Sequence, residues 1–289
     1  MRVASLGEIL WDLIGDKELL GGATFNFSVH LARLGHDVSF VSAVGDDGRG
    51  RRALEASAHL GLSTRFIRTV RDAPTGAVSV TVDAEGQPSY VLHRPAAYDF
   101  VTLNEADLDV LSPAWIYHGT LQLIEPRMRD LLRRLTGRYP FARRFYDINL
   151  RRDSYNAPLL MDLLQGAHVV KLNDDEVIHL QKMAATCHES LESFCRDYAS
   201  RHGWEAVCVT RGEHGCAILH GAEYVEVPGV AVRIADTVGA GDAFAAAFLH
   251  GLNAGWPASK IGAFANRLGA IVASRSGGVP DWSLGELRD

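Results

Sequence analysis

The sequence predicts an α/β fold, with a mostly parallel central sheet flanked by helices and a small β layer beside it. Short runs rich in Val, Ile and Phe alternate along the chain with longer segments whose apolar residues have helical spacing. This alternation is typical of β–α units around a parallel sheet. Phe66–Pro95 departs from it, because this segment contains the pattern of a β-hairpin. With 289 residues, 47% of them hydrophobic, the chain has enough apolar material for one large core.

The elements of the central body follow from this alternation. The candidate strands are Val3–Leu6, Val38–Val44, Trp115–Tyr117, Phe145–Ile148, Val169–Leu172 and Val207–Thr210. The predicted helices between them are Phe25–Leu34, Gly50–Leu60, Pro126–Leu135, Ala157–Leu164, Asp174–Lys182 and Leu191–His202. We expect the last strong helix at Ala243–Ala254, because Gly255 and Pro257 form a helix-stop pattern.

The predicted hairpin begins with the alternating run Val78–Val82, turns at residues 83–86 and returns through Ser89–Leu92. A small β layer beside a large α/β body is a candidate lid.

Charge and composition exclude several classes of function. A net charge of −6 and a pI near 6.0 provide no basic field for nucleic acid or an anionic membrane, so neither is expected as a partner. No apolar stretch approaches the roughly 20 residues that span a bilayer, and the N-terminal apolar run is too short for a signal peptide. The four cysteines form no CxxC pair, which favours a reducing cytoplasm. The twelve histidines lack zinc-ligand spacing.

The run Asp236–Asp242 (DTVGAGD) leads directly into an Ala-rich helix. The first N–H groups of a helix and its dipole form an anion site, and glycine lets an oxygen approach closely. Asp242 then has two interpretations. It is a carboxylate favoured by the helix dipole, or it is a general base that takes a hydroxyl proton during phosphoryl transfer. Walker and dinucleotide motifs are both absent from the sequence.

The run Asp236–Phe244 resembles the C-terminal signature of the ribokinase-like carbohydrate kinases, also called the PfkB family. Gly21–Phe27 with Leu31–Gly35 resembles the N-terminal signature of that family, and Val44–Gly48 follows where the family places its next Gly-Asp element. Two further matches, in family order, are the Asn-x-x-Glu motif at Asn173–Glu176 and the Thr-x-Gly-x-x-Gly nucleotide segment at Thr210–Gly215. Together the matches span nearly the whole chain.

Shorter runs are most similar to bacterial fructokinases. They are Leu6–Leu10, Phe25–Phe27, His93–Ala97 and Asp147–Arg151. The resemblance implies a phosphotransferase that moves the γ-phosphoryl group of ATP to a sugar hydroxyl. Two alternatives stay open: a kinase of the same fold for 2-keto-3-deoxygluconate, ribose or a nucleoside, and a sugar- or nucleotide-binding regulator without turnover.

The resemblance also implies the organisation of the molecule. Residues 1–289 would form a single ribokinase-like domain, with a lid from about residues 10–22 and 66–98 as an insertion. The implied ligands are a sugar, ATP and Mg²⁺. A homodimer through the lid is a hypothesis, since an exposed sheet edge or face invites pairing.

For catalysis, the resemblance assigns Asp242 as the base and the backbone of Gly239, Ala240 and Gly241 as the anion-stabilising turn. Arg151 follows a predicted strand end and would reach the transferring phosphate, because ligands bind at strand ends of open α/β sheets.

Four residues are implied to contact the sugar between the body and the lid, namely Asp12, Gly22, Asn26 and Arg94. Carboxylate, amide and guanidinium groups suit sugar hydroxyls, and a glycine allows close backbone approach. The structural alternatives are an exposed turn acid at Asp12, a helix N-cap at Asn26 and a solvated lid charge at Arg94.

The nucleotide would be bordered by Thr210, Arg211, Gly212 and Gly215, with a plain strand-to-hairpin turn as the alternative. Asn266, on the segment after the last helix, is expected to flank adenine.

Two cation sites are implied. Asn173 and Glu176 would organise Mg²⁺ through water, although their spacing also suits a capping box at a helix start. Asp236 and the main chain of Ala273–Gly278 would hold K⁺, and this K⁺ site is a hypothesis.

Overall fold

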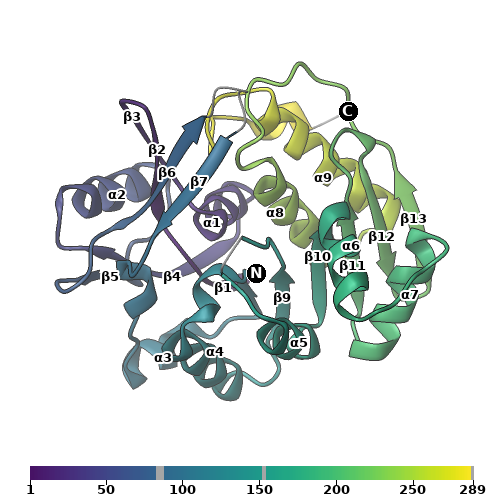
Figure 1. Cartoon of the computed structure of the whole chain (residues 1–289), viewed down its shortest axis with the longest axis horizontal. Coiled ribbons are helices and arrows are strands. Elements are labelled where there is room, and N and C mark those ends of the chain that lie inside the picture. The colour runs from purple at the N-terminus through teal and green to yellow at the C-terminus, as the bar shows by residue number, and fades with distance from the viewer. Residues whose placement is uncertain (83–87, 152–153, 288–289) are drawn as a thin grey trace.

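A large sheet forms the centre of the computed structural model, which describes residues 1–82, 88–151 and 154–287 (Figure 1). Its nine strands are, in spatial order, β13 (Glu223–Val227), β12 (Cys216–His220), β11 (Ala206–Thr210), β10 (Val169–Asn173), β9 (Arg143–Asp147), β8 (Trp115–His118), β1 (Arg2–Leu6), β4 (Asp37–Gly45) and β5 (Ile67–Val70). All neighbouring pairs from β11 to β5 are parallel, whereas β12 and β13 continue the sheet as an antiparallel edge. The predicted mostly parallel sheet is confirmed.

A second sheet of four strands stands beside α1 and α2, at the upper left of Figure 1. Its order is β3 (Lys17–Gly21), β2 (Leu10–Ile14), β6 (Gly76–Val82) and β7 (Pro88–His93), with β2 and β6 parallel and the other two pairs antiparallel. The predicted hairpin is the β6–β7 pair, and its turn lies outside the described residues.

Helices cover both faces of the large sheet, because successive strand side chains point to opposite faces. Val3 and Tyr117 pack into one apolar cluster, and their neighbours Ala4 and Ile116 into the other. The first face is covered by α1 (Ala23–Arg33), α2 (Gly48–His59), α8 (Ala240–Asn253) and α9 (Ala258–Ala273). The second is covered by α3 (Glu105–Leu111), α4 (Pro126–Arg138), α5 (Ala157–Gly166), α6 (Asp174–Met183) and α7 (Leu191–His202).

Two expectations are wrong. Residues 66–70 were assigned to the small layer, but Ile67–Val70 pairs in parallel with β4 and so extends the large sheet. Ala243–Ala254 is not the last strong helix, because Pro257 is the N-cap of α9, which carries Asn266. The apolar stripe of α9 at Ile261, Ala265 and Leu268 is buried, which explains why a second helix forms directly after the stop signal.

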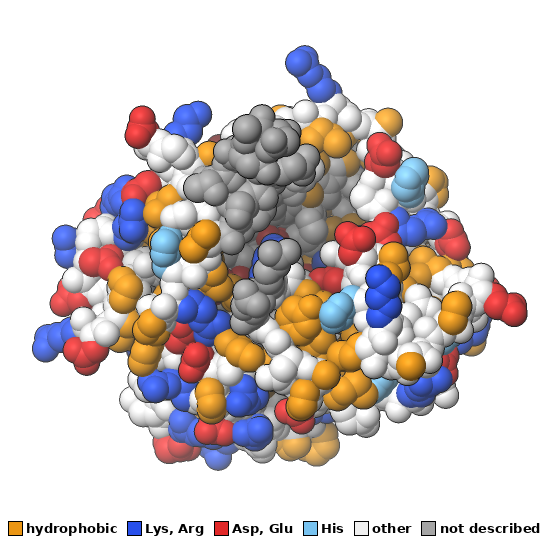
Figure 2. All heavy atoms as spheres, in the orientation of Figure 1, with side chains coloured by type: hydrophobic (Ala, Val, Ile, Leu, Met, Phe, Trp, Pro, Cys, Tyr) orange, Lys and Arg blue, Asp and Glu red, His pale blue; other side chains and the backbone are white. Residues whose placement is uncertain are grey.

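None of the helices in the described ranges combines the length and the apolar character that a bilayer crossing requires. In the face that Figure 2 presents, basic and acidic side chains are interspersed.

Candidate active site

The predicted catalytic residues meet at the carboxyl ends of the parallel strands, where α1 and α8 pack side by side (Figure 1). Asn26, in the first turns of α1, donates from Nδ2 to Oδ2 of Asp242 at 2.9 Å. The charge of Arg151 lowers the pKa of both Asp12 and Asp242, so its guanidinium lies near both carboxylates. The structure therefore brings together residues from the small sheet, the body and the glycine run.

The glycine turn begins α8. Gly239 has a φ of 77°, a left-handed conformation that glycine adopts without strain. A Cβ on Gly239 would lie 2.5 Å from Gly278 Cα, so the turn is packed too tightly for any other residue. The Ala240 N–H donates to Thr237 O at 3.3 Å, whereas Gly241 and Asp242 occupy positions whose N–H groups have no intrahelical partner. These two N–H groups and the helix dipole are the groups available to the predicted anion site.

Asp242 is a half-buried carboxyl whose pKa is raised. Burial raises its pKa to about 7, and the nearby Asp147 acts in the same direction. The hydrogen bond from Asn26 and the charges of Lys171 and Arg151 lower it. A carboxyl that titrates near neutral pH suits a general base.

Sequence reasoning missed a buried ion pair beside this carboxyl. Lys171 Nζ lies 2.9 Å and 3.1 Å from the two carboxylate oxygens of Asp147, and the Tyr117 hydroxyl donates to Asp147 at 3.2 Å. The side chains are 8% and 2% exposed. Although burial opposes an ammonium charge, Asp147 and Glu176 raise the pKa of Lys171. The signal in the sequence was a lysine inside the apolar run Val169–Leu172 and an aspartate at a strand end.

Lys171 also reaches the glycine turn. A Cβ on Gly241 would lie 3.9 Å from its Nζ. The buried ammonium group of Lys171 therefore lies close to the turn that is predicted to bind an anion.

On the sugar side, Asp12 lies on β2 and is half-buried, which raises its pKa to about 6. Gly22 has a φ of 109°, and a Cβ there would lie 2.7 Å from Glu8 O. The N-cap of α1 is Gly22, so the N-cap alternative for Asn26 is wrong. Asn26 Oδ1 is buried without a hydrogen-bond partner among the described residues, and it lies 2.9 Å from where a Cβ on Gly278 would be.

Arg94 is held by other protein groups. Its guanidinium contacts Asp99 at 2.5 Å and donates to Leu121 O at 3.0 Å. Asp99 is 1% exposed, so the pair fastens the end of β7 to the segment beyond it. These contacts favour a structural role for Arg94 over a sugar contact.

Two of the predicted nucleotide residues, Gly215 and Asn266, contact the segment Val227–Gly229. Gly215 has a φ of 84°, and a Cβ there would lie 2.5 Å from Gly229 N. From α9, Asn266 Nδ2 donates to Val227 O at 3.3 Å and to Pro228 O at 2.9 Å.

The run Thr210–Gly215 itself is a turn between the antiparallel strands β11 and β12, as the structural alternative expects. Gly212 begins its 3-10 turn with a φ of 54°. Arg211 pairs with Glu226 at 2.7 Å, and Thr210 Oγ1 donates to Leu172 O at 3.4 Å.

Asn173 and Glu176 form a capping box at the start of α6. Glu176 Oε2 accepts from Asn173 N at 2.8 Å, and Oε1 accepts from Leu150 N at 2.7 Å. Burial raises the pKa of Glu176. Because each carboxylate oxygen can accept a further hydrogen bond, the pair fits a hydrated cation better than direct coordination. Across the described residues no group of three His, Cys, Asp or Glu is placed to hold a metal.

Asp236 lies against the segment proposed to hold K⁺. Its Oδ2 accepts from Gly277 N at 3.0 Å, and its own N–H donates to Ala273 O at 3.2 Å. The carboxylate and the main-chain carbonyls of this segment supply the oxygen donors that a hard cation prefers.

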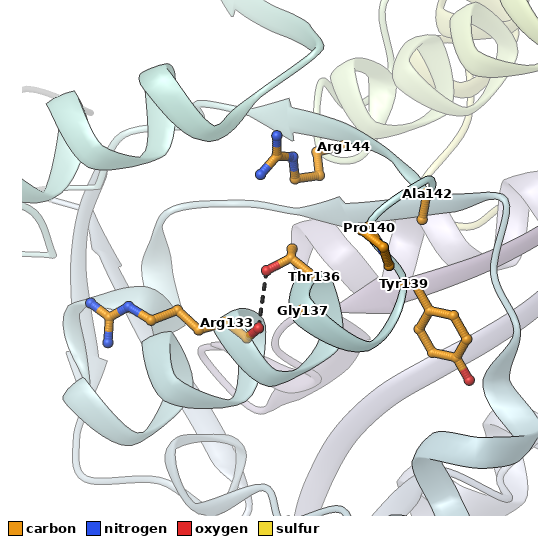
Figure 3. Close-up of a pocket in the computed structure, with 7 residues that line it drawn as sticks. All are labelled: Arg133, Thr136, Gly137, Tyr139, Pro140, Ala142 and Arg144. Carbon is orange, nitrogen blue, oxygen red and sulfur yellow. Dashed lines mark hydrogen bonds between the residues drawn. The ribbon is translucent and has the colours of Figure 1, made fainter.

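A separate hollow of about 410 Å³ lies between the end of α4 and the beginning of β9 (Figure 3). It is lined by residues that include Arg133, Thr136, Tyr139 and Arg144. In Figure 3 the guanidinium of Arg133 and the ring of Tyr139 point away from each other. Since β9 ends at Asp147 on the catalytic side, this hollow is at the opposite edge of the sheet and is not the candidate active site.

Comparison with known proteins places this geometry among carbohydrate kinases. A family model described as pfkB family carbohydrate kinase matches residues 3–283. A Pyrococcus horikoshii protein described as an uncharacterized sugar kinase is 30% identical, over 95% of this chain and 91% of its own length. Its structure in complex with ATP matches with a TM-score of 0.81, over 96% of this chain and 93% of that chain.

Two fructokinases are also similar. Fructokinase-2 of Oryza sativa subsp. japonica is 28% identical, over 96% of this chain and 90% of its own length. A double mutant of a Vibrio cholerae O395 fructokinase, in a form with bound fructose, ADP and potassium, matches with a TM-score of 0.83 at 23% identity. That match covers 99% of this chain and 96% of the other.

Proposed function

The chain belongs to the pfkB family of carbohydrate kinases, and we propose that it is a fructokinase-like enzyme in which Asp242 is the catalytic base. It is an ATP-dependent sugar kinase. The observation that carries the residue assignment is the contact of Asp242 with Asn26 at the start of α8, beside the glycine turn.

In the proposed reaction, a sugar hydroxyl attacks the γ-phosphorus of ATP in line and loses its proton to Asp242. The bond from the γ-phosphorus to the β,γ-bridging oxygen breaks, and ADP leaves. The N–H groups of Gly241 and Asp242 stabilise charge on the phosphoryl oxygens, together with the dipole of α8. Asn26 holds the carboxylate of Asp242 in place through its 2.9 Å hydrogen bond.

The remaining groups are proposed to bind and orient the two substrates. Asp12, Gly22 and Asn26 face the sugar, and Arg151 approaches the transferring phosphate, which its influence on the two carboxyls supports. The turn Thr210–Gly215 and Asn266 border the nucleotide.

Mg²⁺ is proposed to be held through water by Asn173 and Glu176, and it supplies charge neutralisation at the phosphate oxygens when bound.

Asp236 and the main chain of Ala273–Gly278 are proposed to hold K⁺. Rates measured in K⁺ and in tetramethylammonium buffers test this site, and equal rates would remove it.

The small sheet is proposed to act as a lid that keeps water from the phosphoryl group, and to pair with a second copy in a homodimer. Light scattering in solution tests the dimer.

The four cysteines are free, three of them buried, which supports a reducing, cytoplasmic setting.

The acceptor is tested by a panel of fructose, glucose, ribose, 2-keto-3-deoxygluconate and a nucleoside with ATP and Mg²⁺, followed by coupled detection of ADP. We expect fructose to give the highest kcat/KM. A higher value for another acceptor would reassign the substrate, and ADP formation independent of any acceptor would contradict the proposed sugar transfer.

A further inference from the structure

We propose that His30 is a positioning residue for phosphoryl transfer, because it holds Gly278 against the glycine turn and against the side chain that contacts Asp242. The inference rests on the proposed role of Asp242, and it assigns a function to a buried residue of α1 that no substrate touches.

His30 is 0% exposed and both of its ring nitrogens are hydrogen-bonded. Nε2 lies 2.9 Å from Gly278 O, and Trp282 Nε1 donates to Nδ1 at 3.0 Å. An indole N–H can only donate and a carbonyl can only accept, so the imidazole is neutral and carries its proton on Nε2. Burial lowers the pKa of His30 to about 4, which agrees with this single tautomer.

Gly278 is in contact with two parts of the catalytic site. A Cβ on Gly239 would overlap the Gly278 carbonyl, which is the group that His30 binds. A Cβ on Gly278 would lie 2.6 Å from Asn26 Nδ2, the atom that donates to Asp242. A shift of Gly278 would therefore be felt by the anion turn and by the partner of the base together.

One face of α1 organises these contacts. Asn26, His30 and Arg33 follow one another at intervals of four and three residues, so they share a face of the helix. Arg33 donates to Pro280 O at 2.6 Å, two residues beyond the Gly278 carbonyl that His30 binds. The same face thus fixes the C-terminal segment at two points and presents Asn26 to Asp242.

The competing interpretation is a core histidine that contributes stability alone. The two roles differ in the kinetics. If His30 positions the turn, His30→Ala lowers kcat by about tenfold or more in a folded enzyme, since a displacement of about 1 Å at a reacting group can cost that much. KM for ATP should stay within about twofold, because Gly215 and Asn266, two of the predicted nucleotide residues, contact Val227–Gly229 and not Gly278.

Two milder variants test whether the hydrogen bonds of His30 are what matters. The amide of His30→Gln can donate to Gly278 O and accept from Trp282, so it should recover part of kcat. Trp282→Phe keeps a ring beside His30 but removes the N–H donor, and it should give an intermediate loss.

His36→Ala is the matched control. His36 follows the end of α1 and bonds to His250 of α8 at 2.8 Å, so its loss also weakens the contact between these helices. It should lower Tm and leave kcat unchanged. Should His30→Ala fail to fold, the comparison of His30→Gln and Trp282→Phe with His36→Ala decides the question.

Hydrogen exchange provides a readout that does not depend on the acceptor. His30→Ala should speed exchange in peptides covering residues 236–242 and 273–283, whereas His36→Ala should not. Unchanged exchange at 236–242, or a kcat loss no greater than that of His36→Ala at equal loss of Tm, overturns the proposal. Failure of the wild type to phosphorylate any sugar would instead count against the proposed function.

Discussion

Asp242 is the residue whose charge state the surrounding structure controls most directly. It lies at the start of α8, accepts a hydrogen bond from Asn26 and shares its surroundings with Asp147, Lys171 and Arg151. The first interpretation of its position in the sequence agrees with the structure, because the carboxylate lies in the first turn of α8, in the favourable field of the helix dipole. The second interpretation, a general base, stays a proposal.

Asp242→Asn should lower kcat by several orders of magnitude, because the amide cannot accept the hydroxyl proton. ATP affinity, measured by calorimetry, should change little. Asp162→Asn, an exposed acid on α5, is the control for a lost charge on a helix and should leave kcat unchanged. A near-normal kcat in Asp242→Asn would remove this residue from the base role.

The pH dependence follows from the same carboxyl. A base with a pKa of about 7 is active when deprotonated, so log(kcat/KM) should rise with a slope near one below pH 7 and level off above it.

The ionisation of Asp242 affects the stability of the folded protein in the opposite direction. The folded pKa lies above the unfolded value, so stability from this group is present at low pH and is lost as the pH rises through about 7. The Tm of Asp242→Asn minus the Tm of wild type should therefore be larger at pH 8 than at pH 5.

At the scale of elements, the neighbouring strands β9 and β10 carry a buried charge pair, Asp147 and Lys171, whose charges influence the pKa of Asp242. Lys171→Met should destabilise the protein by about 3–5 kcal/mol in urea titrations, because it leaves Asp147 buried without its partner. It should also raise the pH at which kcat/KM levels off, since Lys171 lowers the pKa of Asp242. The double variant Lys171→Met with Asp147→Asn should recover much of the stability. A double variant no more stable than Lys171→Met would contradict the pairing argument.

The turn before α8 makes a second prediction at this scale. Gly239→Ala should lose both stability and kcat, because the alanine has a strained φ of 77° and its Cβ would overlap Gly278. Gly166→Ala is the control, since a Cβ on this glycine of α5 meets nothing within 4 Å. Equal Tm values for the two variants would show that the turn tolerates a side chain.

At the scale of the whole molecule, local patterns predicted the body well. The alternation of apolar runs located the parallel strands other than β5, and the six predicted helices, because strands buried on both faces need continuous apolar residues. The strand Ile67–Val70 was misplaced because a short edge strand carries the same local pattern in either sheet. Only its pairing with β4 decides between them.

The candidate site was predicted as a set of residues and not as a set of contacts. Asn26 and Asp242 carry motif signals, but their hydrogen bond joins residues 216 positions apart. The Lys171–Asp147 pair had no motif, and the pairing of Arg94 with Asp99, only five residues away, was not predicted either. Partners of a charged side chain depend on tertiary packing, which single-sequence patterns do not contain.

The joining of α1 to the C-terminal segment has a consequence for biosynthesis. Asn26 meets Asp242 across 216 residues, and His30 meets Gly278 across 248. During translation, α1 leaves the ribosome long before either partner exists, and a chain halted before Asp242 lacks the proposed base. The strands β1 to β11 can already pair by then, since all of them precede the glycine turn. An incomplete polypeptide that ends before the glycine turn can thus acquire much of the architecture while it lacks the proposed catalytic base.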